Sequence, residues 1–307
     1  MSRKARVKEG DVSRRSFVKL LSAVTAGAIA MPDKAEAFNL DAFLQKHFHE
    51  LSDEEMQKTL ERLTREYNEK YERDDFQVVA DGPLQGVKFA YALNLSKCIG
   101  CRKCVHACVE ENNQHRGTEE RGDQIEYIRV LEMEKGSLDV EKSNHDYDHE
   151  VPAEGKYYMP VQCHHCNKAP CVKACPVEAT WQEPDGIVVV DYNWCIGCRY
   201  CAAACPYWAR KFNWVEPRLP TEVVNPDTHY LGNRPRYNGV MEKCTYCIKR
   251  VRQGLNPACH DVCPTGSRKF GNLLDPDSII RTIIDTKRIY ILKEEVGTDP
   301  SFYYFFD

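Results

Sequence analysis

Trp194-Cys195-Ile196-Gly197-Cys198-Arg199-Tyr200-Cys201, followed by Ala202-Ala203-Ala204-Cys205-Pro206, is the stretch that decides how this sequence is interpreted. Its cysteines follow the spacing C-x2-C-x2-C-x3-C, and a proline comes directly after the last one. Three thiolates at these intervals can surround one face of a cubane iron–sulfur cluster, while the fourth begins a helix that leads to a second cluster. The proline lacks an N–H group and fixes the direction of the chain. The stretch therefore predicts a cluster-binding loop that needs a partner elsewhere in the chain.

All sixteen cysteines of the 307-residue chain fall into four such runs, and none is left over. The first run has the same spacing as the third. The second, C-x2-C-x4-C-x3-C, and the fourth, C-x2-C-x11-C-x3-C, lengthen the middle interval and also end in Cys-Pro. In chain order the runs are Cys98, Cys101, Cys104 and Cys108; Cys163, Cys166, Cys171 and Cys175; Cys195, Cys198, Cys201 and Cys205; and Cys244, Cys247, Cys259 and Cys263.

Structural zinc sites are the main alternative, because zinc commonly takes two Cys-x2-Cys pairs from a protein. Each run here has three closely spaced cysteines and a displaced fourth, so we favour iron–sulfur clusters. Disulfides are disfavoured because neighbouring Cys-x2-Cys thiols cannot all find relaxed partners. Sixteen cysteines also suffice for sixteen ligand positions, so no histidine is needed as a ligand. We expect the four histidines beside the runs to be loop or surface residues: His106, His164, His165 and His260.

The charges around the runs also suit anionic clusters. A cubane with four thiolates carries a formal charge of about −2 when oxidised, which nearby cations must offset. Each neighbouring lysine or arginine alone is typical of a solvated surface charge, but together they predict a positive local field. They are Arg102, Lys103, Lys173, Arg199, Arg210, Lys211, Lys243, Lys249, Arg250, Arg268 and Lys269. The net charge of −4 and the absence of a long basic run argue against nucleic-acid binding.

The N-terminus has the pattern of an export signal. Arg14 and Arg15 precede an apolar stretch at 20–31, and Ala35-Glu36-Ala37 is suited to cleavage. The pattern resembles a twin-arginine signal at 1–37, which implies export of the folded protein to the periplasmic face of the inner membrane. A short amphipathic helix is the alternative. The apolar stretch is shorter than the ~20 residues that span a bilayer, and no later segment qualifies.

Residues 38–84 contain no cysteine and are predicted to form a helical extension. Ser52 and Glu55 have the spacing of a capping box, which opens a helix. An apolar stripe follows at three- and four-residue steps, and we expect it to pack on the chain's own core, with docking of a partner as the alternative. The stripe consists of Met56, Leu60, Leu63, Tyr67 and Tyr71.

The rest of the chain alternates short strands with polar segments. The composition of 86–95 and 186–191 predicts a strand before the first run and another between the second and third runs. The segments 113–157 and 213–240 are polar and are predicted to be insertions between cluster-binding units, where partners often bind.

Four runs of these spacings in this order, together with the stretch at 194–201 and Gly239-Val240-Met241-Glu242-Lys243-Cys244, resemble the electron-transfer subunits of molybdopterin oxidoreductase complexes. This family includes the iron–sulfur subunits of dimethyl sulfoxide, polysulfide, tetrathionate and nitrate reductases and of alternative complex III. The resemblance covers roughly 86–295. It implies an α+β fold of two pseudo-symmetric ferredoxin-like units, each with two [4Fe–4S] clusters. Unit 1 would comprise 85–112 and 241–295, unit 2 158–212, and 296–307 a tail.

The resemblance also implies that ligands are exchanged within each unit. Some relatives lack the second cysteine of the third run and hold a three-iron cluster there, but Cys198 is present here, so four [4Fe–4S] clusters are expected. The first run departs from the pattern in having Val109 in place of proline. The implied ligands are Cys98, Cys101, Cys104 and Cys263 for cluster 1; Cys108, Cys244, Cys247 and Cys259 for cluster 2; Cys163, Cys166, Cys171 and Cys205 for cluster 3; and Cys175, Cys195, Cys198 and Cys201 for cluster 4.

These features predict an electron-transfer subunit without a catalytic site of its own. No phosphate loop, Ser/His/Asp set or Gly-x-Gly-x-x-Gly fingerprint is present. The resemblance implies two partners: a molybdopterin-type or other catalytic or haem subunit, nearer to cluster 1, and a quinone-reactive integral membrane subunit, nearer to cluster 4. Contact with the membrane would be indirect. The alternative is a free-standing polyferredoxin or a metal-binding regulatory protein.

Overall fold

The computed structural model describes residues 6–8, 48–116, 125–215 and 218–307. Apart from Arg6–Lys8, the predicted signal at 1–37 lies outside the described residues. The described residues divide into two compact units, one ending at Lys58 and the other beginning at Thr59 and ending at Asp307. In the first, strand β1 (Arg6–Lys8) pairs antiparallel with β2 (Phe48–Glu50).

Helix α3 (Asp53–Tyr71) begins at the predicted capping box. The Ser52 amide donates to the Glu55 carboxylate at 2.9 Å, and the Glu55 amide donates back to Ser52 Oγ at 3.3 Å. Along the predicted stripe, Leu63, Tyr67 and Tyr71 are buried. Both tyrosine rings pack against Phe76, with centroids 5.5 and 5.4 Å away. The C-terminal half of the helix therefore packs on the chain's own core, as predicted.

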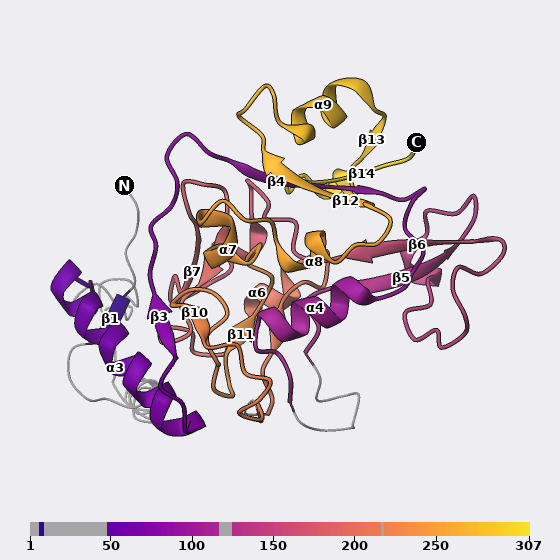
Figure 1. Ribbon diagram of the computed structural model, residues 1–307. Helices are drawn as coiled ribbons and strands as arrows, with labels where there is room; N and C mark the ends of the chain where they lie inside the picture. Colours follow the sequence, from indigo (N-terminus) through magenta and orange to yellow (C-terminus); the bar gives the residue numbers. More distant parts are fainter. Residues whose placement is uncertain (1–5, 9–47, 117–124, 216–217) are drawn as a thin grey trace, which may run out of the picture. The chain divides into compact units, whose positions relative to one another are not determined.

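The largest sheet of the described residues has four strands, in the order β12 (Arg268–Asn272), β4 (Phe89–Asn94), β14 (Phe302–Phe305), β13 (Ile289–Tyr290). β14 runs parallel to β4, and the other two pairings are antiparallel. Helix α9 (Ile279–Thr286) covers one face (Figure 1). Ala90, Ala92 and Phe305 pack there with Ile280 and Ile283.

The opposite face of the sheet carries aromatic side chains, because successive residues of a strand point to opposite faces. Tyr91 stacks on Phe302 with ring centroids 5.1 Å apart, and its ring lies 5.7 Å from Phe270. Tyr246, which lies between two cysteines of the fourth run, approaches Tyr91 at 6.0 Å. This face of the sheet is therefore in contact with a cysteine-bearing segment.

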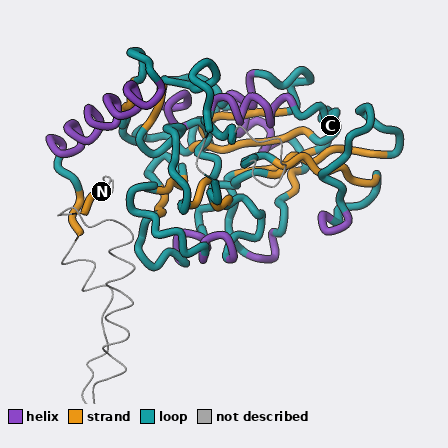
Figure 2. Tube along the Cα trace, turned by 90° about the horizontal axis from the view of Figure 1, so that it is seen from below, coloured by secondary structure: helices purple, strands orange, loops and turns teal. Residues whose placement is uncertain are grey.

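Short elements connected by loops make up the remainder, as Figure 2 shows. The strand pairs are β5 (Arg129–Glu134) with β6 (Lys156–Val161), β7 (Thr180–Gln182) with β8 (Val188–Val190), β9 (Lys211–Phe212) with β11 (Met241–Glu242), all antiparallel, and β3 (Gln77–Val79) with β10 (Asp227–His229), parallel. The helices are α4 (Lys103–Glu111), α5 (Pro170–Lys173), α6 (Tyr200–Ala203), α7 (Ile248–Arg252) and α8 (Ala258–Asp261), with 3-10 turns η2 (Val140–Lys142) and η3 (Glu294–Val296).

Both predicted strands are present, as β4 and β8, each shorter than its predicted range. The segment 296–307, which the sequence suggested was a tail, instead supplies β14, an interior strand of the four-stranded sheet. The predicted insertion at 113–157 contains β5 and not only loops. Within the described residues, no helix has the length and apolar character needed to cross a bilayer.

Candidate metal centres

Two cavities are each lined by four cysteines from two different runs. Group 1, Cys98, Cys101, Cys104 and Cys263, surrounds a cavity with about 350 Å³ of atom-free space including its mouth. Group 3, Cys163, Cys166, Cys171 and Cys205, surrounds one of about 340 Å³. In both, three cysteines of one run meet the last cysteine of another. These are the sets that the family resemblance implied for clusters 1 and 3.

Two further groups are brought together by the packing of short helices. Helix α4 packs on α8, and α5 packs on α6. Group 2 is Cys108, Cys244, Cys247 and Cys259, and the last three interact electrostatically with Cys108. Asn112 Nδ2 lies 3.6 Å from Cys108 Sγ and 3.8 Å from Cys247 Sγ. Group 4 is Cys175, Cys195, Cys198 and Cys201. Cys175 and Cys195 lie close enough to Cys201 to affect its pKa, and Cys198 lies on the loop between Cys195 and Cys201.

Left-handed backbone conformations shape the loops of the first and third runs. Gly100 and Arg102 have φ values of 75° and 55°, and Gly197 and Arg199 have 73° and 66°. Such residues turn successive N–H groups toward one point, which favours an anionic centre. Gly100 must also stay small, since a Cβ there would lie 2.5 Å from the Tyr158 ring.

Hydrogen-bond donors point at several cysteine sulfurs. Gln114 Nε2 lies 3.2 Å from Cys108 Sγ, and the backbone amides of Tyr246 and Met241 lie 3.4 and 3.5 Å from the sulfurs of Cys244 and Cys195. Donors of this kind stabilise thiolate sulfur and tune an iron–sulfur cluster.

Burial favours the protonated form of several of the thiols. It raises the pKa of Cys98, Cys166 and Cys244 to about 12, and that of Cys201 to about 11. Because iron binds the thiolate, metal binding must release these protons and stabilise the charged form. Sites of this kind bind metal with a strong dependence on pH.

Two arginines donate directly to cysteine sulfur. Arg210 Nη2 lies 3.0 Å from Cys171 Sγ, and Arg268 Nη2 lies 3.3 Å from Cys104 Sγ. Both side chains are buried. Arg210 Nη1 is also buried and has no hydrogen-bond partner among the described residues. A buried guanidinium with an unpaired N–H donor is costly in an apolar core. Its position beside thiol sulfur therefore suits a site that holds an anionic cluster.

The lysines and arginines predicted to surround the clusters differ in burial. Arg210, Lys243, Lys249 and Arg268 are buried, whereas the remaining seven are exposed or half-buried. Lys243 Nζ donates to the carbonyls of Val188 and Cys244.

His164 and His165 are loop residues, which is one of the two predicted alternatives, but both are buried. His164 stacks on Phe302 at 4.8 Å, and His165 stacks on Tyr246 at 3.7 Å. Their loop lies against the aromatic face of the four-stranded sheet, which removes it from solvent. His106 is exposed and His260 is half-buried, as expected.

A buried ion network next to the fourth run was not predicted. The Glu242 carboxylate forms ion pairs with Arg116 at 2.9 Å and with Arg236 at 2.8 Å, and the Tyr127 hydroxyl donates a hydrogen bond to it at 3.0 Å. The two arginines hold the pKa of Glu242 below its usual value against the opposing effect of burial. Three of these partners come from the predicted insertions, which therefore fold onto the core beside Cys244. Arg116 and Tyr127 are more than 100 residues from Glu242 in the sequence, so no local pattern indicated the network.

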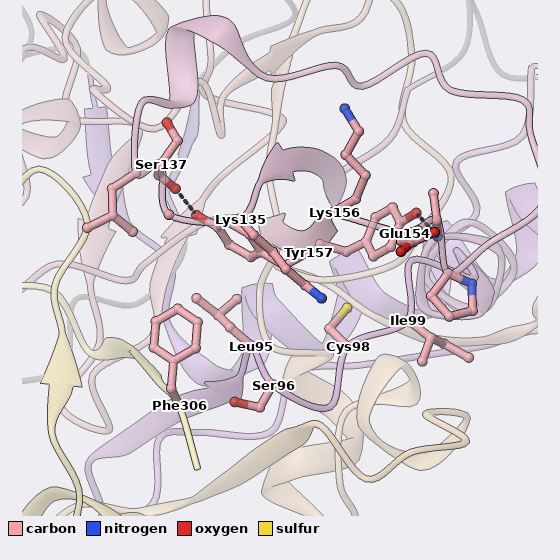
Figure 3. A pocket seen from close by; sticks show the side chains of 15 residues that line it. Leu95, Ser96, Cys98, Ile99, Lys135, Ser137, Glu154, Lys156, Tyr157 and Phe306 are labelled. Carbon is pink, nitrogen blue, oxygen red and sulfur yellow. Dashed lines mark hydrogen bonds between the residues drawn. The ribbon is translucent and has the colours of Figure 1, made fainter.

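A larger pocket opens beside group 1. Leu95, Tyr157 and Phe306 line it together with Cys98 and Lys135, and Figure 3 shows the Cys98 sulfur among these side chains. Its atom-free space measures about 1490 Å³, open solvent included. Because Cys98 also lines the group 1 cavity, the pocket approaches that group from outside.

In the described part of the chain, no three His, Cys, Asp or Glu side chains converge closely enough to hold a single metal ion. A cubane does not require such convergence, because each thiolate binds a different iron atom of the cluster.

Comparison with known proteins identifies the family. Two models, each described as a 4Fe-4S dicluster domain, match residues 155–220 with 231–273 and residues 97–179. A putative dimethyl sulfoxide reductase iron-sulfur subunit of Halobacterium salinarum is 42% identical over 70% of this chain and 78% of its own length. The Hdr-like menaquinol oxidoreductase iron-sulfur subunit 1 of Archaeoglobus fulgidus is 36% identical over 71% and 82%. The iron-sulfur cluster-binding subunit of menaquinone reductase from Nitratidesulfovibrio vulgaris is 35% identical over 71% and 88%. The chain belongs to this family of 4Fe-4S dicluster iron–sulfur subunits of reductases and menaquinol oxidoreductases.

Proposed function

We propose that this chain is the electron-transfer subunit of a respiratory complex and holds four [4Fe–4S] clusters, with groups 1 to 4 as their ligands. Bound clusters would supply one-electron redox chemistry. The chain's own residues would bind iron through sixteen thiolates, shield the clusters from water and donate hydrogen bonds to sulfur.

One observation carries the proposal: the four cysteine groups form a continuous series. Arg268 contacts Cys104 of group 1 and lies 3.7 Å from Cys259 of group 2. Cys244 of group 2 lies close enough to Cys163 of group 3 for a thiolate at Cys163 to raise the pKa of Cys244. Cys201 of group 4 interacts with Cys171 of group 3. A series of neighbouring redox centres suits transfer of electrons through the chain. A metal site with a purely structural role does not require other metal sites beside it.

The pocket at Cys98 supports cluster 1 as the end that exchanges electrons with a catalytic or haem-bearing partner. It combines apolar and aromatic lining with an approach to a ligand sulfur, as a docking site for another subunit requires (Figure 3). Cluster 4, at the other end of the series, would then face a quinone-reactive membrane subunit. The twin-arginine pattern supports export to the periplasmic face of the membrane.

Purification tests this function against the alternative of a free-standing polyferredoxin or regulatory protein. The chain, tagged at its C-terminus in its native host, would be isolated from detergent-solubilised membranes. We expect a stable assembly with a catalytic or haem subunit and an integral membrane subunit, whose clusters are reduced or oxidised by a quinol or quinone analogue. Recovery of the chain alone in the soluble fraction would contradict the proposal.

A further inference from the structure

Three buried cations touch the cysteine groups without a carboxylate to neutralise them. They are Arg268, Lys243 and Arg210, and each is at most 6% exposed. Among the described residues, none of the three forms an ion pair with Asp or Glu. Other buried arginines are neutralised: Arg116 and Arg236 share Glu242, and Arg252 pairs with Asp185 at 2.9 Å. A buried charge without a partner is costly, so these three positions require negative charge from elsewhere.

Each of the three lies at a boundary between consecutive groups. Arg268 reaches Cys104 of group 1 with Nη2 and Cys259 of group 2 with Nη1. Gln162 Oε1, at 2.8 Å from Nη1, holds the guanidinium in this position. The contacts of Arg268 are thus divided between the two groups.

Lys243 lies between groups 2 and 3. Its ammonium binds the carbonyl of Cys244, a member of group 2, and the carbonyl of Val188. Val188 lines the cavity that the four cysteines of group 3 surround.

Arg210 lies on the wall of the group 3 cavity and faces group 4. Nη2 donates to Cys171 Sγ at 3.0 Å and to Thr180 Oγ1 at 2.8 Å. Cys201 of group 4 is close enough for the charge of Arg210 to favour its thiolate. Arg210 and Arg268 each follow a Cys-Pro pair at the same distance in sequence, Cys205-Pro206 and Cys263-Pro264.

We propose that these cations raise the reduction potentials of the clusters they separate: Arg268 for clusters 1 and 2, Lys243 for clusters 2 and 3, and Arg210 for clusters 3 and 4. The inference rests on the proposed function. A cluster that takes one electron from a reduced partner gains one negative charge, and a fixed cation at the boundary stabilises that charge without a proton. Because the cation is shared, it stabilises the electron on either side, which favours transfer across the boundary.

The test is a set of substitutions in the holoprotein within its complex, followed by redox titration with dithionite and mediator dyes and detection by EPR. Arg268→Gln removes the charge but keeps a donor, and Arg268→Lys keeps the charge. Arg210→Gln and Arg210→Lys form the corresponding pair. Arg252→Gln is the matched control, because it removes a buried arginine that contacts carboxylates and not cysteines.

We expect each Gln variant to lower the midpoint potentials of two of the four clusters, a different two for each arginine. The expected reduction equilibrium changes at least tenfold, which is about 59 mV for one electron. The Lys variants should retain most of the native potentials, and Arg252→Gln should lower stability without moving them.

The iron content separates failure of this inference from failure of the proposed function. Protein with sixteen iron atoms and unmoved potentials in both Gln variants, or equal shifts of all four clusters, overturns the assignment of the cations. Native protein without four cubanes overturns the proposed function itself. If a Gln variant does not assemble, Lys243→Gln provides the comparison, because removal of this charge should lower the midpoint potentials of two clusters and leave the other two unchanged.

Discussion

Replacement of Gly197 by alanine should expel one cluster. Gly197 lies in the Cys195–Cys198 loop with φ +73°, and a Cβ there would lie 2.3 Å from the Gly239 carbonyl oxygen. That oxygen belongs to backbone held in place, since the Gly239 amide donates to Asn213 O at 2.7 Å. The left-handed conformation costs alanine about 1 kcal/mol, and overpacking a fixed contact adds about 1–3 kcal/mol. The loop should therefore be destabilised by roughly 2–4 kcal/mol.

Gly86→Ala is the matched control. Gly86 has nearly the same φ, +69°, but an added Cβ would meet nothing within 4 Å, so only the conformational cost of about 1 kcal/mol applies. We expect Gly197→Ala to be purified with about four iron atoms fewer per chain, and to lose its visible absorbance at a lower temperature on heating. Gly86→Ala should keep its full iron content. Equal iron content and thermal behaviour in the two variants would show that the contact with the Gly239 carbonyl does not destabilise the loop.

Two further predictions concern buried charges. Glu242→Gln leaves two buried guanidiniums without their carboxylate and should destabilise the fold by about 3–5 kcal/mol, seen as a lower temperature of cluster loss. Glu134→Gln, at an exposed ion pair, is the control and should change that temperature little. Equal effects of the two substitutions would contradict the role of burial. Burial lowers the pKa of Lys211 from 10.5 to about 8. The unfolded chain therefore binds a proton that the folded chain lacks between these values, so stability should rise with pH across this window. Lys211→Met should abolish that rise in denaturation midpoints measured from pH 8 to 10, and an unchanged slope would rule Lys211 out as its source.

Local signals in the sequence predicted the elements that depend on nearby residues. The reciprocal hydrogen bonds of Ser52 and Glu55 follow from a spacing of three residues. The strand at Val188–Val190 follows from its uniformly β-branched composition. The spacing of the cysteines likewise indicated that each group combines residues of two runs.

What the sequence left open depends on contacts between distant residues. The aromatic run Phe302–Phe305 has β-type composition, but its parallel pairing with Tyr91–Asn94 joins segments more than 200 residues apart. The same holds for the Arg116–Glu242 pair, which is also distant in sequence. Arg102 and Arg268 look equivalent beside their cysteines, yet Arg268 begins strand β12 and is buried, whereas Arg102 precedes helix α4 and is half-buried. Burial of charge was therefore the least predictable property of the site.

Native mass spectrometry of the purified chain, combined with iron and acid-labile sulfide analysis, measures directly how many clusters the chain holds. We expect a mass increment of four [4Fe–4S] clusters, with about sixteen iron atoms and sixteen sulfides per chain. An iron content near twelve or fifteen in intact protein, a three-iron EPR signal, or bound zinc without sulfide would contradict it.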